Sequence, residues 1–190
     1  MDDTICSTNE LILETADLYD KEVLGGTGVK DKDAYEFTEM MGWPEGMKGQ
    51  FFADRLETIM ANSPIKPGAH DVINQLHDEG WEVVIISFRK DKYLKDPYKL
   101  TIDWLKENDI HYDKVFVNTG TKEDECVENG VTLFVDDKES HCADVSKCGI
   151  DVLLFTNAYN HDENRFNRVD NWYQVYDFIK EKYNGRKSSY

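Results

Sequence analysis

The chain has 190 residues, and 38 Asp and Glu against 22 Lys and Arg give a formal net charge of −16 with a sequence pI near 4.6. This length predicts one domain with a small insert, and a hydrophobic content of 40% supports a packed core over a disordered chain. The acidic balance argues against binding to a nucleic-acid polymer, and no apolar run approaches the ~18 residues of a membrane span.

The first third of the chain predicts helices. Apolar residues at three- and four-residue spacing favour a helix over 8–24, which a Gly-Gly-Thr-Gly run would end. Residues 31–61 also favour helix and are rich in aromatic and methionine side chains, with Pro44 and Gly46 breaking the segment in two. The acidic first residues do not have the pattern of a signal peptide.

From residue 65 onward, expected helices and strands alternate. Short continuous apolar runs favour strands buried on both faces, and the segments between them have helical spacing. The expected strands are 81–86, 114–117, 131–135 and 151–155, and the expected helices are 71–79, 99–108, 123–128, 140–148 and 172–183, followed by a polar tail over 184–190. This alternation is typical of an α/β fold with a parallel sheet between two helix layers, whose sites lie beyond the carboxyl ends of the strands.

Polar residues follow the expected strands at that edge. Ser87 and Arg89 follow the first strand, Lys122 comes shortly after the second, and Asp136 and Asp137 follow the third. Two adjacent carboxylates at the end of a buried strand repel each other unless a cation compensates them, and Mg²⁺ prefers such oxygen ligands. The sequence therefore predicts a metal or phosphate site at the carboxyl edge of the sheet.

Each of these residues also has a simpler interpretation when taken alone. Ser87 suits a turn at a strand end, Lys122 suits a solvated helix start, and Arg89 begins a basic run that suits a solvated face. Thr4 suits a helix cap. The four cysteines lack metal-ligand spacing and are expected to be reduced thiols. The prediction of a site therefore depends on the order of the polar residues along the chain.

This ordered set resembles the haloacid dehalogenase-like phosphohydrolases, whose motifs are Asp-x-Asp-x-Thr/Val, a Ser or Thr after a strand, a Lys, and an acidic pair after another strand. Ser87 resembles the second motif, Lys122 the third, and Asp136-Asp137 the fourth. Within that superfamily the chain resembles the 5'(3')-deoxyribonucleotidase (cytosolic type C) group. The supporting segments are Pro67-Gly68-Ala69, Ser87-x-Arg89, Trp104-Leu105 and the run from Asn157 through Asn160, Arg165-Phe166 and Val169 to Asn171-Trp172.

The resemblance implies a three-layer, Rossmann-like core over residues 1–13 and 65–190, with a helical cap over 14–64. It implies an Mg²⁺-dependent 5'(3')-nucleotidase that hydrolyses (deoxy)nucleoside monophosphates through an aspartyl-phosphate. A phosphatase of another small phosphomonoester and a non-catalytic binding protein of this fold are the alternatives. The expected partner is a small phosphorylated substrate, without a nucleic-acid polymer or a membrane. A cytoplasmic location is expected, and homodimer formation stays open.

The resemblance also implies roles for residues of this sequence. Asp2 would act as general acid and base, with a pKa that burial raises, beside the catalytic residues Ser87 and Lys122. Ser87, Arg89 and Lys122 would bind the phosphoryl group. The implied Mg²⁺ ligands are Asp2, Asp136 and Asp137. The implied substrate contacts are Thr4 and the cap aromatics Trp43, Phe51 and Phe52, with packing of the cap as the alternative for the aromatics.

One departure from the motif concerns the amino end. Met1-Asp2-Asp3-Thr4 supplies the later part of the first motif, so the nucleophilic Asp and the strand before it would precede Met1. Removing a central strand would leave two facing sheet edges with unpaired backbone groups. Three explanations stay open: the sequence begins at an internal Met of a longer protein, the protein begins here and is catalytically impaired, or Asp2 is the nucleophile in a shifted register with Thr4 in the acid/base position.

Overall fold

A computed structural model describes residues 1–31 and 37–183. The polar tail predicted over 184–190 therefore lies outside the described residues. The helices are α1 (Thr8–Glu22), α2 (Phe37–Met41), α3 (Met47–Asn62), α4 (Ala69–Asp78), α5 (Pro97–Glu107), α6 (Lys122–Glu128), α7 (Glu139–Lys147), the 3₁₀ turn η1 (Ala158–Asn160) and α8 (Trp172–Tyr183). The strands are β1 (Val84–Ser87), β2 (Lys114–Val117), β3 (Leu133–Asp136), β4 (Asp151–Phe155) and β5 (Asn167–Val169).

The strands β1 to β5 pair in parallel, which confirms the predicted α/β class. β1 pairs with β2 in one sheet, and β3, β4 and β5 follow one another in a second. β2, β4 and α8 have the bounds that the sequence predicts. β5 was not predicted, because its three residues include Asn and Arg and form no apolar run.

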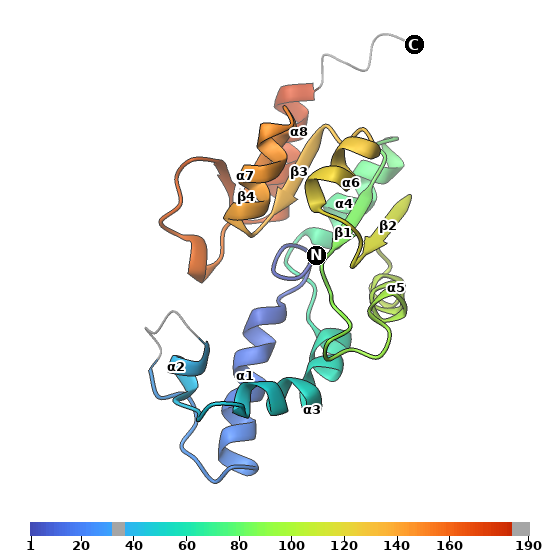
Figure 1. Cartoon of the computed structure of the whole chain (residues 1–190). Coiled ribbons are helices and arrows are strands. Elements are labelled where there is room, and N and C mark those ends of the chain that lie inside the picture. The colour runs from blue at the N-terminus through green and yellow to red at the C-terminus, as the bar shows by residue number, and fades with distance from the viewer. Residues whose placement is uncertain (32–36, 184–190) are drawn as a thin grey trace.

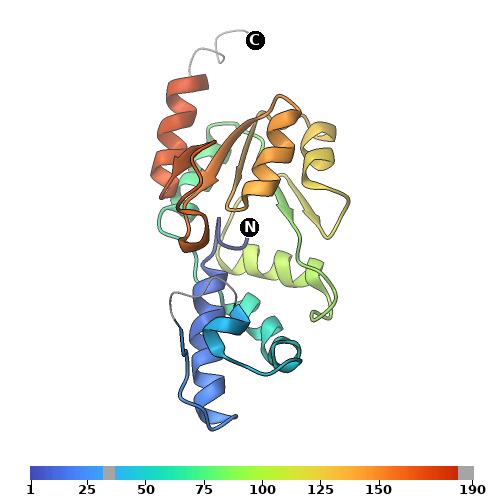
Figure 2. The same ribbon diagram turned by 60° about the vertical axis from the view of Figure 1, so that its left-hand side comes forward.

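Helices cover both faces of the strands and make three layers (Figures 1 and 2). α4 packs against α8, and α6 packs against α7. Neighbouring residues of β1 point to opposite faces: Ile85 belongs to the core with α4 and α8, whereas Ile86 packs with Cys126 and Val145 of α6 and α7. A strand buried on both faces needs a continuous apolar run, which is why the sequence pattern identified it.

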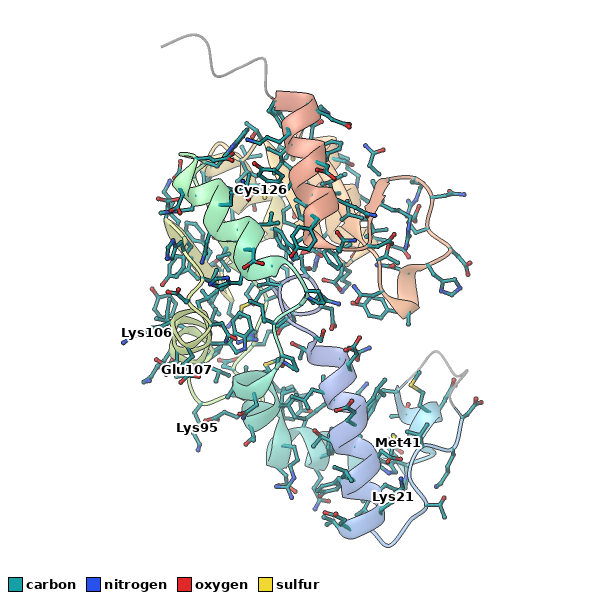
Figure 3. The ribbon with its side chains drawn as sticks, turned by 180° about the vertical axis from the view of Figure 1, so that it is seen from behind. Lys21, Met41, Lys95, Lys106, Glu107 and Cys126 are labelled. Atoms are coloured by element: carbon teal, nitrogen blue, oxygen red, sulfur yellow. The ribbon has the colours of Figure 1, made fainter. Side chains whose placement is uncertain are left out.

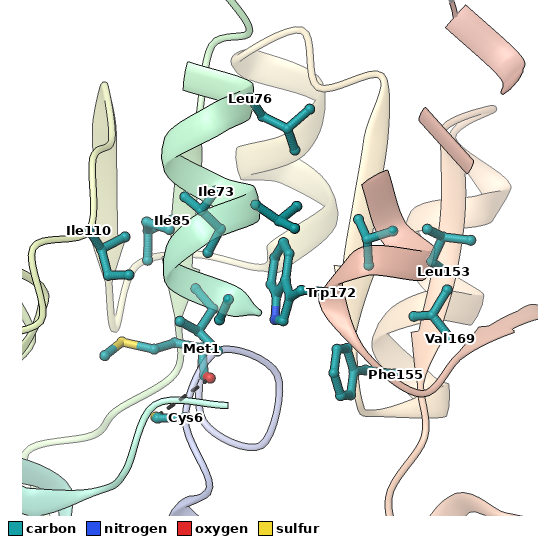
Figure 4. Packing of buried hydrophobic residues seen from close by; sticks show 14 of the residues in the cluster. Met1, Cys6, Ile73, Leu76, Ile85, Ile110, Leu153, Phe155, Val169 and Trp172 are labelled. Atoms are coloured by element: carbon teal, nitrogen blue, oxygen red, sulfur yellow. Dashed lines mark hydrogen bonds between the residues drawn. The ribbon is translucent and has the colours of Figure 1, made fainter. Parts of the chain in front are cut away.

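The sheet differs from the expected single sheet because β1 and β3 do not pair. Each has one hydrogen-bonded neighbour among the described strands, so their other edges face a cavity of about 340 Å³. Both strands line this cavity, together with apolar side chains of α4 and α8 and with Met1. Figure 4 shows Met1 and Ile85 to one side and Leu153 and Phe155 to the other, with Trp172 between them. We call this cavity the inter-sheet slot.

The helices α1, α2 and α3 form a separate helical region with its own core, below the sheets in Figure 1. Figure 3 shows the same separation from behind, with Lys21 and Met41 in the helical region and Cys126 among the sheet elements. α1 begins at Thr8, which is ahead of the predicted cap boundary at residue 14. No helix among the described residues is long and apolar enough to cross a membrane.

Candidate functional site

A second cavity of about 390 Å³ lies at the carboxyl ends of β1 and β3, between the sheets and the helical region. The predicted site residues line this cavity together: Asp2, Ser87, Arg89, Lys122, Asp136 and Asp137. Parallel strands bring the residues at their carboxyl ends to one edge of the sheet, so the strand pattern alone predicted that these side chains lie together. We call this cavity the rim cavity.

Lys122 and Asp136 form a buried ion pair in the rim cavity. Lys122 Nζ lies 2.5 Å from Asp136 Oδ2, and His141 Nδ1 lies 3.1 Å from Oδ1. Burial raises the pKa of Asp136, but His141 and Lys122 outweigh burial and hold the pKa well below its usual range. The Thr121 hydroxyl caps α6 by accepting from the backbone N–H of Asp124, which fixes the helix start and points Lys122 inward. The alternative of a solvated Lys122 is wrong, since the residue is 5% exposed.

Asp2 is held by Arg89. Arg89 Nη2 donates to Asp2 Oδ1 at 2.7 Å, Nε donates to Oδ2 at 3.1 Å, and the Thr8 hydroxyl donates to Oδ1 at 2.8 Å. Burial raises the pKa of Asp2, but the Arg89 charge and hydrogen bonds prevail and hold the pKa well below its ordinary value. The expected raised pKa at Asp2 is therefore wrong in this arrangement, and so is the alternative of a solvated Arg89.

Two buried donors of residues that line the rim cavity have no hydrogen-bond partner among the described residues. They are the Ser87 hydroxyl and Arg89 Nη1, and both residues are 2% exposed. A buried donor without a partner costs about 1–3 kcal/mol, and a water, an ion or a ligand at the cavity would satisfy it. Together with Lys122 they present one neutral and two cationic donors, which is a set that suits the oxygens of a phosphoryl group.

Asp137 is fixed by neutral donors. The Thr4 hydroxyl donates to Oδ1 at 3.1 Å, the Tyr159 hydroxyl donates to Oδ2, and the Asn160 side chain donates to the backbone carbonyl at 2.7 Å. Thr4, expected at the substrate, is instead 2% exposed and positions this carboxylate. Tyr159 and His141 were missed, because the first lies in the 3₁₀ turn after β4 and the second lies within α7, away from the strand-end motifs.

Asp3 also lies at the rim cavity, with a left-handed backbone φ of 55°. Burial is the main cause that raises the pKa of Asp3 to about 6, and the neighbouring charges of Asp137 and Asp2 raise it further. The backbone N–H of Asn9 donates to Asp3 Oδ1 at 2.9 Å and opposes this rise. At the amino end the pKa is thus raised at Asp3, whereas the sequence led us to expect a raised pKa at Asp2.

One part of the lining of the rim cavity, which we call the wall, is apolar and aromatic. The wall includes Leu56 and Met60 of α3, and Phe88, Tyr93 and Leu94 from the segment after β1. The rim cavity thus offers cationic donors and apolar side chains in one lining, so an occupant that carries both a phosphate and a flat or apolar group would match it.

Two of the predicted cap contacts do not reach this wall. Trp43 and Phe51 are 8% and 0% exposed and belong to the core of the helical region, where Trp43 Nε1 donates to Asp20. Their expected contact with a substrate is wrong, because the two rings pack against each other inside this core, with centroids 5.3 Å apart. Phe52 is partly buried and lies 5.9 Å from Tyr93 between ring centroids, so it supports the wall without lining the cavity.

The carboxylates of the rim cavity have the donor chemistry for Mg²⁺. Mg²⁺ takes oxygen ligands, and Asp2, Asp136 and Asp137 supply six carboxylate oxygens at one cavity. Arg89, Lys122 and Tyr159 now bind oxygens of these three residues. Within the described chain, these oxygens do not converge to within 4.8 Å of one another. The residues fit the ion if Mg²⁺ replaces Lys122 as the partner of Asp136, or Arg89 as the partner of Asp2.

Comparison with known proteins gives one consistent result. The family model described as "5' nucleotidase, deoxy (Pyrimidine), cytosolic type C protein" matches residues 43–184. A candidate nucleotidase of Oceanobacillus iheyensis is 28% identical over 152 residues, which are 77% of each chain. A nucleotidase of Clostridium acetobutylicum is 24% identical over 158 residues, or 80% of each chain. A haloacid dehalogenase-like hydrolase of Streptococcus pneumoniae shares the fold, with a TM-score of 0.63, 13% identity and coverage of 94% and 95%.

Proposed function

The chain belongs to the family of 5' nucleotidase, deoxy (Pyrimidine), cytosolic type C proteins, and on that premise we propose that it hydrolyses deoxynucleoside monophosphates with Mg²⁺ at the rim cavity. The family supports the reaction class, a phosphomonoester hydrolysis. The single observation that carries the proposal is the pair of unpartnered buried donors, Ser87 Oγ and Arg89 Nη1, beside Lys122. The four free cysteines and the family description support a cytoplasmic location.

In this proposal the donors of the rim cavity bind the phosphoryl oxygens. Ser87 donates one hydrogen bond, Arg89 uses the Nη1 that does not serve Asp2, and Lys122 neutralises charge as the bond to the leaving oxygen breaks. Fixed donors aimed at developing charge in a buried cavity contribute about 3–4 kcal/mol each to the lowering of a barrier. The apolar wall with Tyr93 would then receive the nucleoside.

The metal in this proposal is held by Asp136 and Asp137. Asp136 ends β3 and Asp137 follows it, and Thr4 and Tyr159 orient the Asp137 carboxylate. Bound Mg²⁺ would supply further positive charge at the phosphoryl oxygens. The contacts of Thr4, Tyr159 and Asn160 keep Asp137 in position for this role, and His141 does the same for Asp136.

The source of the nucleophilic carboxylate is the second part of the proposal. Asp2 is a poor candidate, because Arg89 and Thr8 already bind the same oxygen of its carboxylate. The inter-sheet slot has two open strand edges and an apolar lining, which suit one extended strand parallel to β1 and β3. We propose that such a strand, continuous with Met1, fills the slot and delivers an Asp to the rim cavity.

The experiment compares two forms of the protein, the 190-residue chain and a chain extended by its upstream coding residues. Each is assayed with Mg²⁺ against 5'- and 3'-deoxynucleoside monophosphates, sugar phosphates and p-nitrophenyl phosphate, with EDTA as control. We expect only the extended form to hydrolyse these compounds, and we expect it to hydrolyse deoxynucleoside monophosphates faster than the others. A preference for sugar phosphates would contradict the proposal of a nucleotide substrate. Equal turnover by both forms would contradict the proposal that an added strand supplies the nucleophile.

A further inference from the structure

A cluster of histidine and aspartate side chains lies away from the rim cavity. His77 and Asp78 form the last turn of α4, and His111 lies in the connection from α5 to β2. One ligand atom from each of the three lies within 4.8 Å of the others. None of the three lines either cavity. α4 leads into β1, whose carboxyl end carries Ser87, so this cluster lies at the opposite, amino end of the strands.

We propose that His77, Asp78 and His111 form a second metal site, specific for a transition-metal dication such as Zn²⁺. Asp78 Oδ1 lies 3.9 Å from His77 Nδ1 and 3.8 Å from His111 Nδ1. Two ligands of a tetrahedral Zn²⁺ lie about 3.3 Å apart, given metal bonds of about 2.0–2.1 Å. Small rotations of these partly exposed side chains would shorten the present separations of 3.8 and 3.9 Å to that ligand distance. Imidazole ligands favour Zn²⁺ over Mg²⁺, so the two sites differ in their preferred ion.

The far nitrogens of both rings support this assignment. His77 Nε2 lies 3.6 Å from Asp113 Oδ1, and His111 Nε2 lies 3.9 Å from Asp109 Oδ1. Histidines that bind metals usually present the other ring nitrogen to a carboxylate, which orients the ring and raises its basicity. Here each ring has an Asp78 oxygen near Nδ1 and a second carboxylate near Nε2, both slightly beyond hydrogen-bond distance, so metal binding would need only small side-chain rotations to complete this arrangement.

The backbone that carries the cluster is fixed in place. The Asn74 side chain of α4 donates to the Asp109 carbonyl at 2.7 Å and accepts from the backbone N–H of His111 at 2.8 Å. Asp113 Oδ2 accepts from the backbone N–H of Val83 at 2.8 Å. The carboxyl end of a helix also carries partial negative charge, which favours a cation at the last turn of α4. A bound ion would therefore join α4 to the α5–β2 connection.

The test titrates Zn²⁺ into metal-stripped protein by calorimetry, with excess Mg²⁺ present to occupy the rim cavity and a reductant for the thiols. We expect one Zn²⁺ per chain and a higher melting temperature with Zn²⁺. Both effects should be lost in His77→Ala and in His111→Ala and retained in His161→Ala, which changes an exposed histidine outside the cluster. Asp109→Asn should weaken binding about 10-fold through ring orientation alone, and Asn tolerates the left-handed φ of 51° there.

Two results would overturn this second site. The first is Zn²⁺ binding that is absent in the wild type or unchanged in both His→Ala variants. The second is binding that disappears in Cys148→Ser, since that exposed thiol would then be the ligand. Circular dichroism of each variant without metal confirms that loss of binding is not loss of fold.

Discussion

Arg89 divides its guanidinium between two tasks: Nη2 donates to Asp2 Oδ1 at 2.7 Å, while Nη1 is buried without a partner among the described residues. Nη2 compensates the buried carboxylate of Asp2, and Nη1 is a cationic donor that can bind an anion. A lysine could not do both, because its single ammonium has no planar fork. The structure and the binding chemistry of the rim cavity therefore depend on the same side chain.

The first prediction concerns stability. Arg89→Ala should lower the free energy of unfolding by about 3 kcal/mol, because it leaves the Asp2 carboxylate without its charge partner. Urea denaturation measures this change. The control is Arg165→Ala, whose side chain is 61% exposed and pairs with Glu163, and which should cost under about 1 kcal/mol. A loss no larger than that of the control would show that the Arg89–Asp2 pair is not needed for folding.

Activity should depend strongly on Lys122. Lys122→Ala should lower kcat by about 10²–10³ in the catalytically complete protein, because the charge beside the phosphoryl group is lost. Steady-state hydrolysis of a deoxynucleoside monophosphate with Mg²⁺ measures kcat. Lys147→Ala removes an exposed lysine at the far end of α7 and should leave kcat unchanged. Retained activity in Lys122→Ala, with the fold verified, would remove Lys122 from the catalytic set.

Replacing an aromatic side chain by Ala should have different effects in the helical region and in the cavity wall: the first should lower stability, and the second should raise KM. Phe51 is fully buried among Tyr19 and Trp43, so Phe51→Ala should cost about 3–5 kcal/mol of unfolding free energy. Tyr93 lines the rim cavity, so Tyr93→Ala should cost much less stability and raise KM for a nucleotide. Urea denaturation and KM are measured for both variants. A KM effect confined to Phe51→Ala would reverse these two assignments.

Acid should weaken one contact that ties α8 to α4. Hydrogen bonds from Lys180, Tyr176 and Gln75 lower the pKa of Glu79 to about 2 from about 4.5. Because the folded pKa is the lower one, this stabilisation is complete above about pH 4.5 and is lost as pH falls toward 2. Wild type and Glu79→Gln should therefore differ in unfolding free energy near pH 6 and converge as the pH approaches 2. A difference that is constant with pH would contradict the ionised contact.

The sequence predicted the parts of this protein that depend on local pattern. β2, β4 and α8 follow from apolar runs and helical spacing, and the polar residues at the carboxyl ends of β1 and β3 do meet at one cavity. β5 could not be predicted, because its short polar segment becomes a strand only by pairing with β4. The pKa of Asp2 depends on Arg89, 87 positions away, and strand-end spacing does not report such a contact. Trp43 and Phe51 show the same limit, since composition cannot distinguish a packed aromatic from one in a binding wall.

The central claim is that Ser87, Arg89 and Lys122 bind a phosphoryl group in the rim cavity, and calorimetric titration with inorganic phosphate tests it without turnover. Wild type and Lys147→Ala should bind equally, and Ser87→Ala should bind about tenfold or more weakly, because a hydrogen bond to a charged group contributes about 1.5–3 kcal/mol. Ser87→Ala should also fold as stably as wild type without phosphate, since its hydroxyl has no partner to lose. Phosphate binding by Ser87→Ala that equals wild type would contradict the claim.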